Sequence, residues 1–136
     1  MRRALFVRVN RIANTVVRRL GLRRFRGGDL LYLTTIGNKS GKQRTTPALY
    51  LFDEGRWIVV ASNGGADWEP GWWLNLRAGS PATVELEGVS TPVTGVEVDG
   101  AERHRLWAKL NEMFDYEAYQ AKVSRRIAVV ALSPVG

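Results

Sequence analysis

The residues best suited to chemistry lie in the polar segment Thr34–Pro47, between two apolar runs. Gly37 and Gly41 allow a tight turn with close backbone approach, and lysines, an arginine, a serine and threonines surround them. Main-chain N–H groups, cations and hydroxyls on such a turn favour binding of an anion. The pattern GxxxxGK[ST] is absent, so this is not a Walker loop. A solvated hairpin turn is the alternative, and this segment alone does not decide.

A second candidate site begins where an apolar run ends in Ser-Asn-Gly-Gly, at residues 62–65. A hydroxyl and an amide lie there beside bare backbone, which lets a flat ligand with polar edges approach closely. Trp72 and Trp73 follow on a predicted helix and point about 100° apart, so one can line a pocket while the other packs in the core. Asn75 shares the face of Trp72. Alternatively, both tryptophans are core residues and the glycine pair is only a turn.

Two phenols and an amine share one face of another predicted helix, at Tyr116, Tyr119 and Lys122. Facing a pocket, the phenols could donate hydrogen bonds or a proton to a substrate oxygen. Packed on a neighbour, they would be ordinary core residues. The chain has no cysteine and one histidine, His104, so neither a Ser/His/Asp set nor a metal site is expected. An enzyme of this composition needs a bound cofactor for the difficult chemistry.

Positive charge is concentrated at the N-terminus. The net charge is +7 over 136 residues, yet residues 1–28 carry nine arginines and no acidic residue, and the remainder carries 11 basic and 13 acidic side chains. Apolar residues recur every three or four positions from Leu5 to Leu20, which predicts a basic amphipathic helix. This helix could pack on the domain or lie on an anionic membrane surface. Nucleic-acid binding is disfavoured, because no recognition pattern is present.

Apolar runs and turn residues predict the elements that position these groups. Strands are expected at 29–36, 45–53, 56–62, 82–87, 91–98 and 127–132, with a hairpin turn at 53–55. Helices are expected at 70–78, from a capping box at Asp99 and Glu102 to Met113, and at 116–123. This α+β pattern favours one small barrel flanked by helices. The apolar runs are too short to span a membrane and no signal peptide is evident, so a cytoplasmic protein is expected.

Five segments, in order, resemble the deazaflavin-dependent nitroreductase family of actinobacteria: residues 33–47, 60–65, 72–76, 102–107 and 116–120. The resemblance covers about Gly28 to Pro134. It implies an FMN-binding-like split β-barrel with flanking helices at residues 28–136, preceded by the basic amphipathic helix or arm at residues 1–27. It also implies coenzyme F420, a deazaflavin, as the cofactor.

The resemblance assigns site residues as well. The phosphate and polyglutamate tail of the cofactor would bind at the first turn, to Asn38, Lys39, Ser40, Gly41, Arg44 and Thr46. Family members usually carry arginine where Asn38 stands. The deazaflavin ring would contact Ala61, Ser62, Asn63, Gly64, Trp72 and Asn75. Tyr116 and Tyr119 would place an acceptor over the ring, whereas the family tyrosine one turn earlier falls at Met113 or Phe114.

The expected activity is hydride transfer from reduced deazaflavin to a quinone, a nitro compound or another conjugated electrophile. Ser62, Tyr116 and Tyr119 are the expected catalytic residues, and Ser62 and Tyr116 would stabilise or protonate the resulting negative oxygen. One alternative is FMN or haem on the same barrel. Another is a non-catalytic cofactor carrier or membrane-peripheral binding protein, attached to the inner face of the membrane through residues 1–26.

Overall fold

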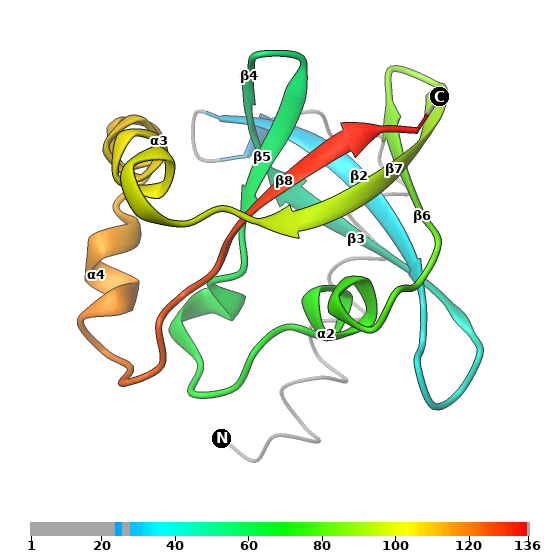
Figure 1. Cartoon of the computed structure of the whole chain (residues 1–136), viewed down its shortest axis with the longest axis horizontal. Helices are drawn as coiled ribbons and strands as arrows, with labels where there is room; N and C mark the ends of the chain where they lie inside the picture. The colour runs from blue at the N-terminus through cyan, green and yellow to red at the C-terminus, as the bar shows by residue number, and fades with distance from the viewer. Residues whose placement is uncertain (1–23, 26–27, 136) are drawn as a thin grey trace.

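The structure, a computed structural model, describes residues 24–25 and 28–135 (Figure 1). The described strands are β1 (Arg24–Phe25), β2 (Gly28–Ile36), β3 (Gln43–Leu49), β4 (Leu51–Asp53), β5 (Arg56–Val60), β6 (Ala82–Leu86), β7 (Val89–Glu97) and β8 (Val129–Pro134). The described helical elements are the 3-10 turn η1 (Asn63–Gly65), α2 (Gly71–Arg77), α3 (Gly100–Met113) and α4 (Tyr116–Gln120). The helix predicted from Leu5 to Leu20 lies outside the described residues.

The strands form one antiparallel sheet that curls back on itself. Its order is β1-β2-β6-β7-β8-β5-β4, and β3 pairs with β2. Only Tyr50 separates β3 from β4, so one bent segment pairs with β2 at its start and with β5 at its end. The sheet therefore closes into a barrel, visible in Figure 1 as crossing ribbons. The structure confirms the predicted α+β barrel with flanking helices.

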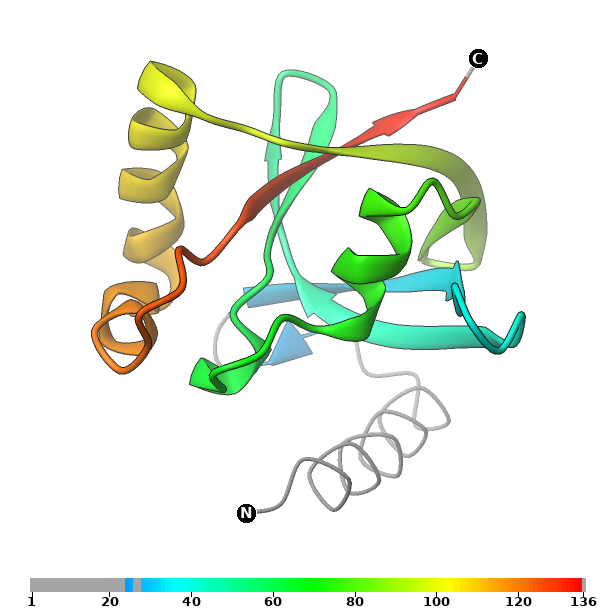
Figure 2. The ribbon, with the colours of Figure 1, turned by 60° about the horizontal axis from the view of Figure 1, so that its bottom comes forward.

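Apolar side chains fill the inside of the curled sheet. In β2, Leu31 and Leu33 are fully buried and Tyr32 between them is half-buried, which is the alternation expected of a strand with one core face. Trp73 and Leu76 of α2 belong to the same apolar cluster. Helix α2 therefore packs against the inside of the barrel, as Figure 2 shows.

Helix α3 covers the outer face of the sheet. Its Leu106 and Leu110 are buried against Ile58 of β5 and Ala131 of β8. Asp99 begins the helix as predicted, because its Oδ1 accepts a hydrogen bond from Gly100 N at 2.8 Å. The predicted capping box itself does not form, since Asp99 binds Gly100 N and not the N–H of Glu102, and the carboxylate of Glu102 binds Arg56.

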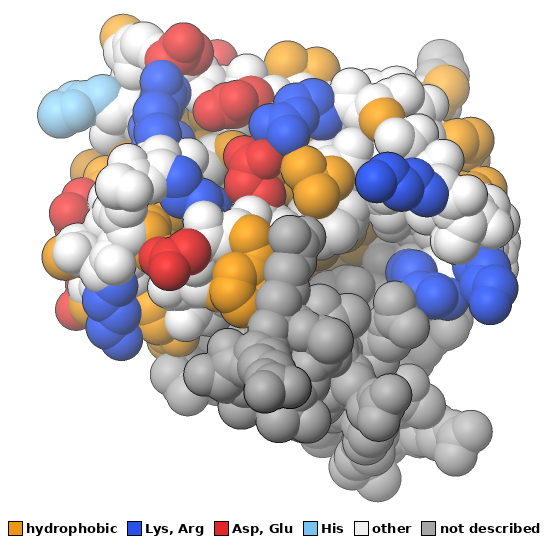
Figure 3. Space-filling view, turned by 90° about the horizontal axis from the view of Figure 1, so that it is seen from below, with side chains coloured by type: hydrophobic (Ala, Val, Ile, Leu, Met, Phe, Trp, Pro, Cys, Tyr) orange, Lys and Arg blue, Asp and Glu red, His pale blue; other side chains and the backbone are white. Residues whose placement is uncertain are grey.

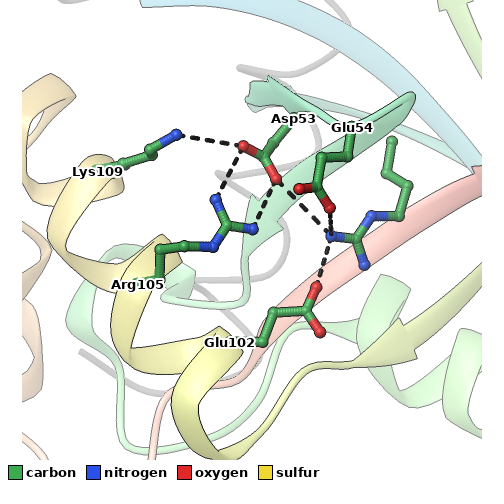
Figure 4. A network of polar contacts seen from close by, with 6 residues as sticks. Asp53, Glu54, Glu102, Arg105 and Lys109 are labelled. Carbon is green, nitrogen blue, oxygen red and sulfur yellow. Dashed lines mark hydrogen bonds and ion pairs between the residues drawn. The ribbon is translucent and has the colours of Figure 1, made fainter.

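A network of charged side chains joins the β4–β5 hairpin to α3 (Figure 4). Asp53 is only 9% exposed, and Arg105 donates to its two oxygens at 3.2 and 2.9 Å, with Lys109 at 3.4 Å. Arg56 bridges Asp53, Glu54 and Glu102. The hydrogen bonds from Arg105 lower the pKa of Asp53 to about 2, because they stabilise its charged form. The network fixes the hairpin turn at residues 53–55 on the helix.

Several element boundaries differ from the predictions; for example, the helix expected at 116–123 ends at Gln120. The strand expected at 45–53 is interrupted at Tyr50, where the chain bends from one partner strand to another. The strand expected at 56–62 ends at Val60, and the turn η1 takes its place. The last strand begins at Val129 instead of Ile127, although Ile127 is fully buried as predicted. In addition, Arg24–Phe25 of the predicted arm pairs with the start of β2 as β1.

Candidate active site

The turn between β2 and β3 is held in a defined shape by its own main chain. Gly37 N donates to Lys42 O at 2.8 Å, and Gly41 N donates to Gly37 O at 2.9 Å. The Ser40 hydroxyl accepts from Lys42 N at 3.2 Å. A Cβ on Gly37 would lie 2.4 Å from Ser40 Oγ, so this position tolerates only glycine without rearrangement. The predicted tight turn is confirmed.

The cations of this turn are open to solvent. Lys39 and Lys42 are exposed, and Arg44 is half-buried with one hydrogen bond, from Nη1 to Gln43 O at 3.2 Å. Within the described residues, none of the three forms an ion pair. Figure 3 shows Lys and Arg side chains gathered at one edge of the molecule, on the side where Figure 1 places this turn. An anion can therefore reach three positive charges here.

Helix α2 fastens the same turn to the barrel. Asn75 Oδ1 accepts from the main-chain N of Asn38 at 3.1 Å, and its Nδ2 donates to Thr35 Oγ1 at 3.0 Å. Ser80, just after the helix, accepts from Ile36 N at 2.9 Å. The resemblance assigned Asn75 to the ring of the cofactor, and in the structure its amide contacts the β2–β3 turn and β2. No local pattern indicated Ser80, because its partner is 44 residues away.

The Ser-Asn-Gly-Gly segment forms the turn η1 directly after β5. Asn63 (φ 49°) and Gly65 (φ 82°) have positive φ, and Asn63 Nδ2 donates to Trp68 O at 3.1 Å. Gly64 is exposed, and the space where its Cβ would be is open. Arg125, which the sequence did not single out, donates to three main-chain carbonyls of this loop.

Tyr119 of α4 lies against this turn. A Cβ on Gly65 would be 3.1 Å from Tyr119 Cδ1, so the absence of a side chain permits the phenol ring to pack there. Lys122 Nζ lies over the Tyr119 ring at 5.6 Å from its centroid. The structure thus brings together two of the constellations that the sequence singled out separately, the residue 62–65 turn and the tyrosine helix.

Tyr116, which was expected on the substrate side of the site, is buried in the structure. It is 4% exposed and packs against Phe114 and Trp107, with ring centroids at 5.1 and 6.3 Å. Burial raises the pKa of Tyr116 to about 12, so its proton stays in place at neutral pH. Tyr116 therefore packs as a core residue would, whereas Tyr119 is the phenol that lies beside the η1 turn.

One of the two adjacent tryptophans, Trp73, packs in the core, and the pocket role expected for Trp72 stays a prediction. Trp73 is 3% exposed in the barrel core, and Trp72 is half-buried at the edge of the same cluster. Within the described residues, Trp73 Nε1 has no hydrogen-bond partner. In both Figure 1 and Figure 2, the β2–β3 turn and η1 lie on one side of the barrel with α2 between them. The candidate site therefore extends along this side, from the cationic turn to Tyr119.

A shallow cavity of about 340 Å³ lies elsewhere, between α3 and α4. Its charged and amide side chains and Trp107 already have partners within the protein. Arg126 pairs with Asp99 at 2.7 Å, and Arg103 donates to Ile127 O at 2.8 Å. Trp107 Nε1 donates to Glu117. We therefore assign no chemistry to this cavity.

A family model described as F420H(2)-dependent quinone reductase matches residues 7–134. The chain belongs to this family. An F420H(2)-dependent quinone reductase of Mycobacterium tuberculosis is 36% identical over 107 residues, which cover 76% of this chain and 72% of the relative. A solved F420-H2 dependent reductase (FDR-A) is 33% identical, with a TM-score of 0.68, over 76% of this chain and 93% of its own. This F420H(2)-dependent quinone reductase family member therefore has the split-barrel fold that the sequence predicted.

The haem storage protein HutZ of Vibrio cholerae has a similar backbone, with a TM-score of 0.60 over 88% of this chain and 89% of its own. At 16% identity, it shows that the barrel is shared and nothing about the ligand. In the described part of this reductase-family chain, no helix is long and apolar enough to cross a membrane. No cluster of three metal-ligating side chains occurs in the described part either.

Proposed function

We propose that this protein is an oxidoreductase that passes a hydride from reduced coenzyme F420 to a quinone. The observation that supports this most is the arrangement along one side of the barrel. An open cationic turn lies at one end, a turn packed on Tyr119 lies at the other, and α2 lies between them. A long cofactor with an anionic tail and a flat ring needs a cationic site for the tail and a second, separate site for the ring.

The β2–β3 turn fits the anionic tail. Lys39 and Arg44 supply charge, and Gly41 leaves open space beside its Cα. Ser40 shapes the turn through Lys42 N and keeps donor capacity for the ligand. Asn38 contributes its main-chain N–H to Asn75, so this position orders the turn without adding charge. Thr46 lies on β3, opposite Leu33, and is half-buried close to the turn.

The η1 loop fits the ring through its main chain and Ser62. Ala61 is fully buried and both its N and O have partners, so it orders the strand end. Ser62, Asn63 and Gly64 follow at the surface of this loop, and Trp72 is half-buried on α2. We assign these four residues to the ring and Asn75 to the tail turn.

The protein groups position reactants and stabilise charge. F420, when bound, supplies the hydride. Tyr119, held against Gly65, and Ser62 are hydroxyl donors for the oxygen that becomes negative on the acceptor. Lys122, over the Tyr119 ring, adds positive charge beside that donor. Holding the two reactants in contact accounts for most of the rate gain.

The test is a titration of the protein with oxidised F420, FMN and haemin, followed by tryptophan fluorescence. We expect saturable quenching by F420 alone, reduced in a Trp72→Phe variant. In Lys39→Ala, the affinity for F420 should fall about tenfold, because a charge-assisted contact is lost. Binding of the deazaflavin chromophore without its tail should be unchanged in that variant. Tighter binding of FMN or haemin than of F420 would overturn the assignment.

We further propose that the basic segment at residues 1–26 attracts the protein to the anionic inner surface of the cell membrane, where quinones reside. Nine arginines without an acidic residue support this electrostatically. Co-sedimentation with vesicles containing 30 mol% or so of phosphatidylserine should fall steeply when Arg2, Arg3, Arg8 and Arg11 are changed to Gln. Equal sedimentation of both full-length proteins would contradict the proposal.

A further inference from the structure

Arg125 lies between α4 and β8 and reaches back to the loop that follows β5. Its Nη1 donates to Ala61 O at 3.2 Å, its Nη2 to Ser62 O at 3.0 Å, and its Nε to Ala66 O at 3.1 Å. One side chain thus binds both ends of the residue 61–66 loop. The three acceptors lie 59 to 64 residues from Arg125 along the chain.

The loop needs this support because it leaves the sheet. Ala61 N still donates to Ala128 O at 2.9 Å, but the chain then turns away and its carbonyls lose the ladder partners that a strand would give them. Asn63 has a φ of 49°, which is sparsely populated for residues other than glycine. Such a conformation persists where surrounding contacts determine it.

The guanidinium group suits this task better than another cation. It presents several N–H donors in a rigid plane, so it can bind separate carbonyl oxygens at once. Burial lowers the pKa of Arg125, because the charged guanidinium is partly removed from water where it contacts these carbonyls.

The segment that carries Arg125 is itself anchored on α4. Gln120 Nε2 donates to Arg125 O at 2.8 Å, and Gln120 Oε1 accepts from Ile127 N at 2.9 Å. Gln120 follows Tyr119 directly, and the Tyr119 ring packs on Gly65. Arg125 therefore connects the helix that carries Tyr119 with the loop against which Tyr119 packs.

We propose that Arg125 is a positioning residue of the active site: it holds the Ala61–Ala66 loop in the shape that sets Gly65 against Tyr119 and fixes the place of Ser62 in the loop. Its catalytic consequence rests on the proposed function, whereas its effect on the loop does not. Arg125 acts on bound ligands through the loop.

The first experiment measures amide hydrogen exchange in the cofactor-free, full-length protein. The variants are Arg125→Gln, which removes the guanidinium group, Arg125→Lys, which keeps the charge without the planar set of donors, and Arg126→Gln as control. Arg126 is the adjacent arginine, and it pairs with exposed Asp99 instead of the loop. In Arg125→Gln, amides 62–66 should exchange on the order of tenfold faster while β5 and β8 stay protected. Arg125→Lys should be intermediate, and Arg126→Gln should match the wild type in this loop.

The second experiment measures binding and turnover with menadione as acceptor. Arg125→Gln should lower kcat by about tenfold or more, because the loop no longer places its groups accurately. Its affinity should fall by the same factor for F420 and for the chromophore without a tail, since the tail turn is untouched. A variant that merely unfolds in part would instead lower the active fraction and leave the apparent KM unchanged.

The outcomes separate this proposal from the proposed function. Absence of F420 binding in the wild type would overturn the proposed function. The exchange data would still test whether Arg125 holds the loop in place. If the wild type turns over and Arg125→Gln equals Arg126→Gln in both exchange and kcat, the positioning role is wrong. If Arg125→Gln fails to fold, Arg125→Lys decides. Loop exchange and kcat equal to those of the wild type in Arg125→Lys would show that the three contacts to carbonyls do not matter, and would overturn the positioning role.

Discussion

At the scale of single residues, environment decides what a side chain can do. Tyr116 and Tyr119 are both tyrosines on one short helix, yet the first is buried and the second lies at the η1 turn. Burial raises the pKa of Tyr116 to about 12, because it disfavours the charged phenolate. Asp53 shows the opposite effect, because its arginine partner lowers its pKa to about 2.

The two tyrosines allow a direct comparison. Tyr119→Phe should lower kcat for menadione reduction about fivefold to tenfold, because one hydrogen bond to the developing oxygen charge is lost. Its affinity for F420 should stay unchanged. Tyr116→Phe should leave kcat within about twofold, since its ring, not its hydroxyl, packs in the core. If Tyr116→Phe lost turnover and Tyr119→Phe did not, the catalytic hydroxyl would be that of Tyr116.

Asp53 should make stability depend on pH. Its folded pKa of about 2 lies below the usual value of 3.8, so its stabilising contribution is present above about pH 4 and is lost as pH falls toward 2. Because Arg105 and Lys109 are partly exposed, Asp53→Asn should lower the free energy of unfolding at pH 7 by only about 1 kcal/mol. Urea unfolding at pH 7 and pH 3 measures this, with exposed Asp67→Asn as the control. A loss that is equally large at both pH values would contradict the ion-pair explanation.

At the scale of elements, α2 lies between the two ends of the candidate site and holds one of them, the β2–β3 turn. Its Trp73 and Leu76 anchor it in the barrel, and its Asn75 holds the β2–β3 turn through Asn38 N and Thr35 Oγ1. A helix of seven residues is too short to be stable alone, so these contacts fix its position. The β2–β3 turn is therefore ordered by a neighbouring element as well as by its own glycines.

Asn75→Leu tests this connection. Removing both hydrogen bonds should loosen the turn and weaken F420 binding about fivefold or more. The chromophore without its tail should bind as in the wild type, because the η1 loop keeps its contacts. Fluorescence titration with the two ligands measures the difference. Equal weakening for both ligands would instead place Asn75 at the ring, as the sequence suggested.

The sequence predicted local features well and distant contacts poorly. A continuous apolar run located β2, and Asp99 marked the start of α3, because both signals depend on neighbours in the chain. It did not reveal the contacts of Ser80 or Arg125, whose partners lie more than 40 residues away. It also could not tell Tyr116 from Tyr119, since residues three apart share a helix face and only the packing of α4 separates them.

At the scale of the whole molecule, the curled sheet is a scaffold that several families share, and the side chains on one side of it distinguish this chain. The split barrel also occurs in a haem storage protein, so the fold alone does not select the ligand. Membership in the F420H(2)-dependent quinone reductase family and the cationic turn together favour F420. A carrier without catalytic activity would need the same binding site and would differ only in turnover.

The most direct test of the proposed reductase is therefore steady-state oxidation of reduced F420 by menadione, followed by the return of deazaflavin absorbance under anaerobic conditions. The wild-type protein should accelerate this reaction in a saturable way with respect to both reactants, and Tyr119→Phe should slow it without weakening F420 binding. Tight binding of F420 with no acceleration of its oxidation by menadione would contradict the proposed quinone reductase and favour a carrier.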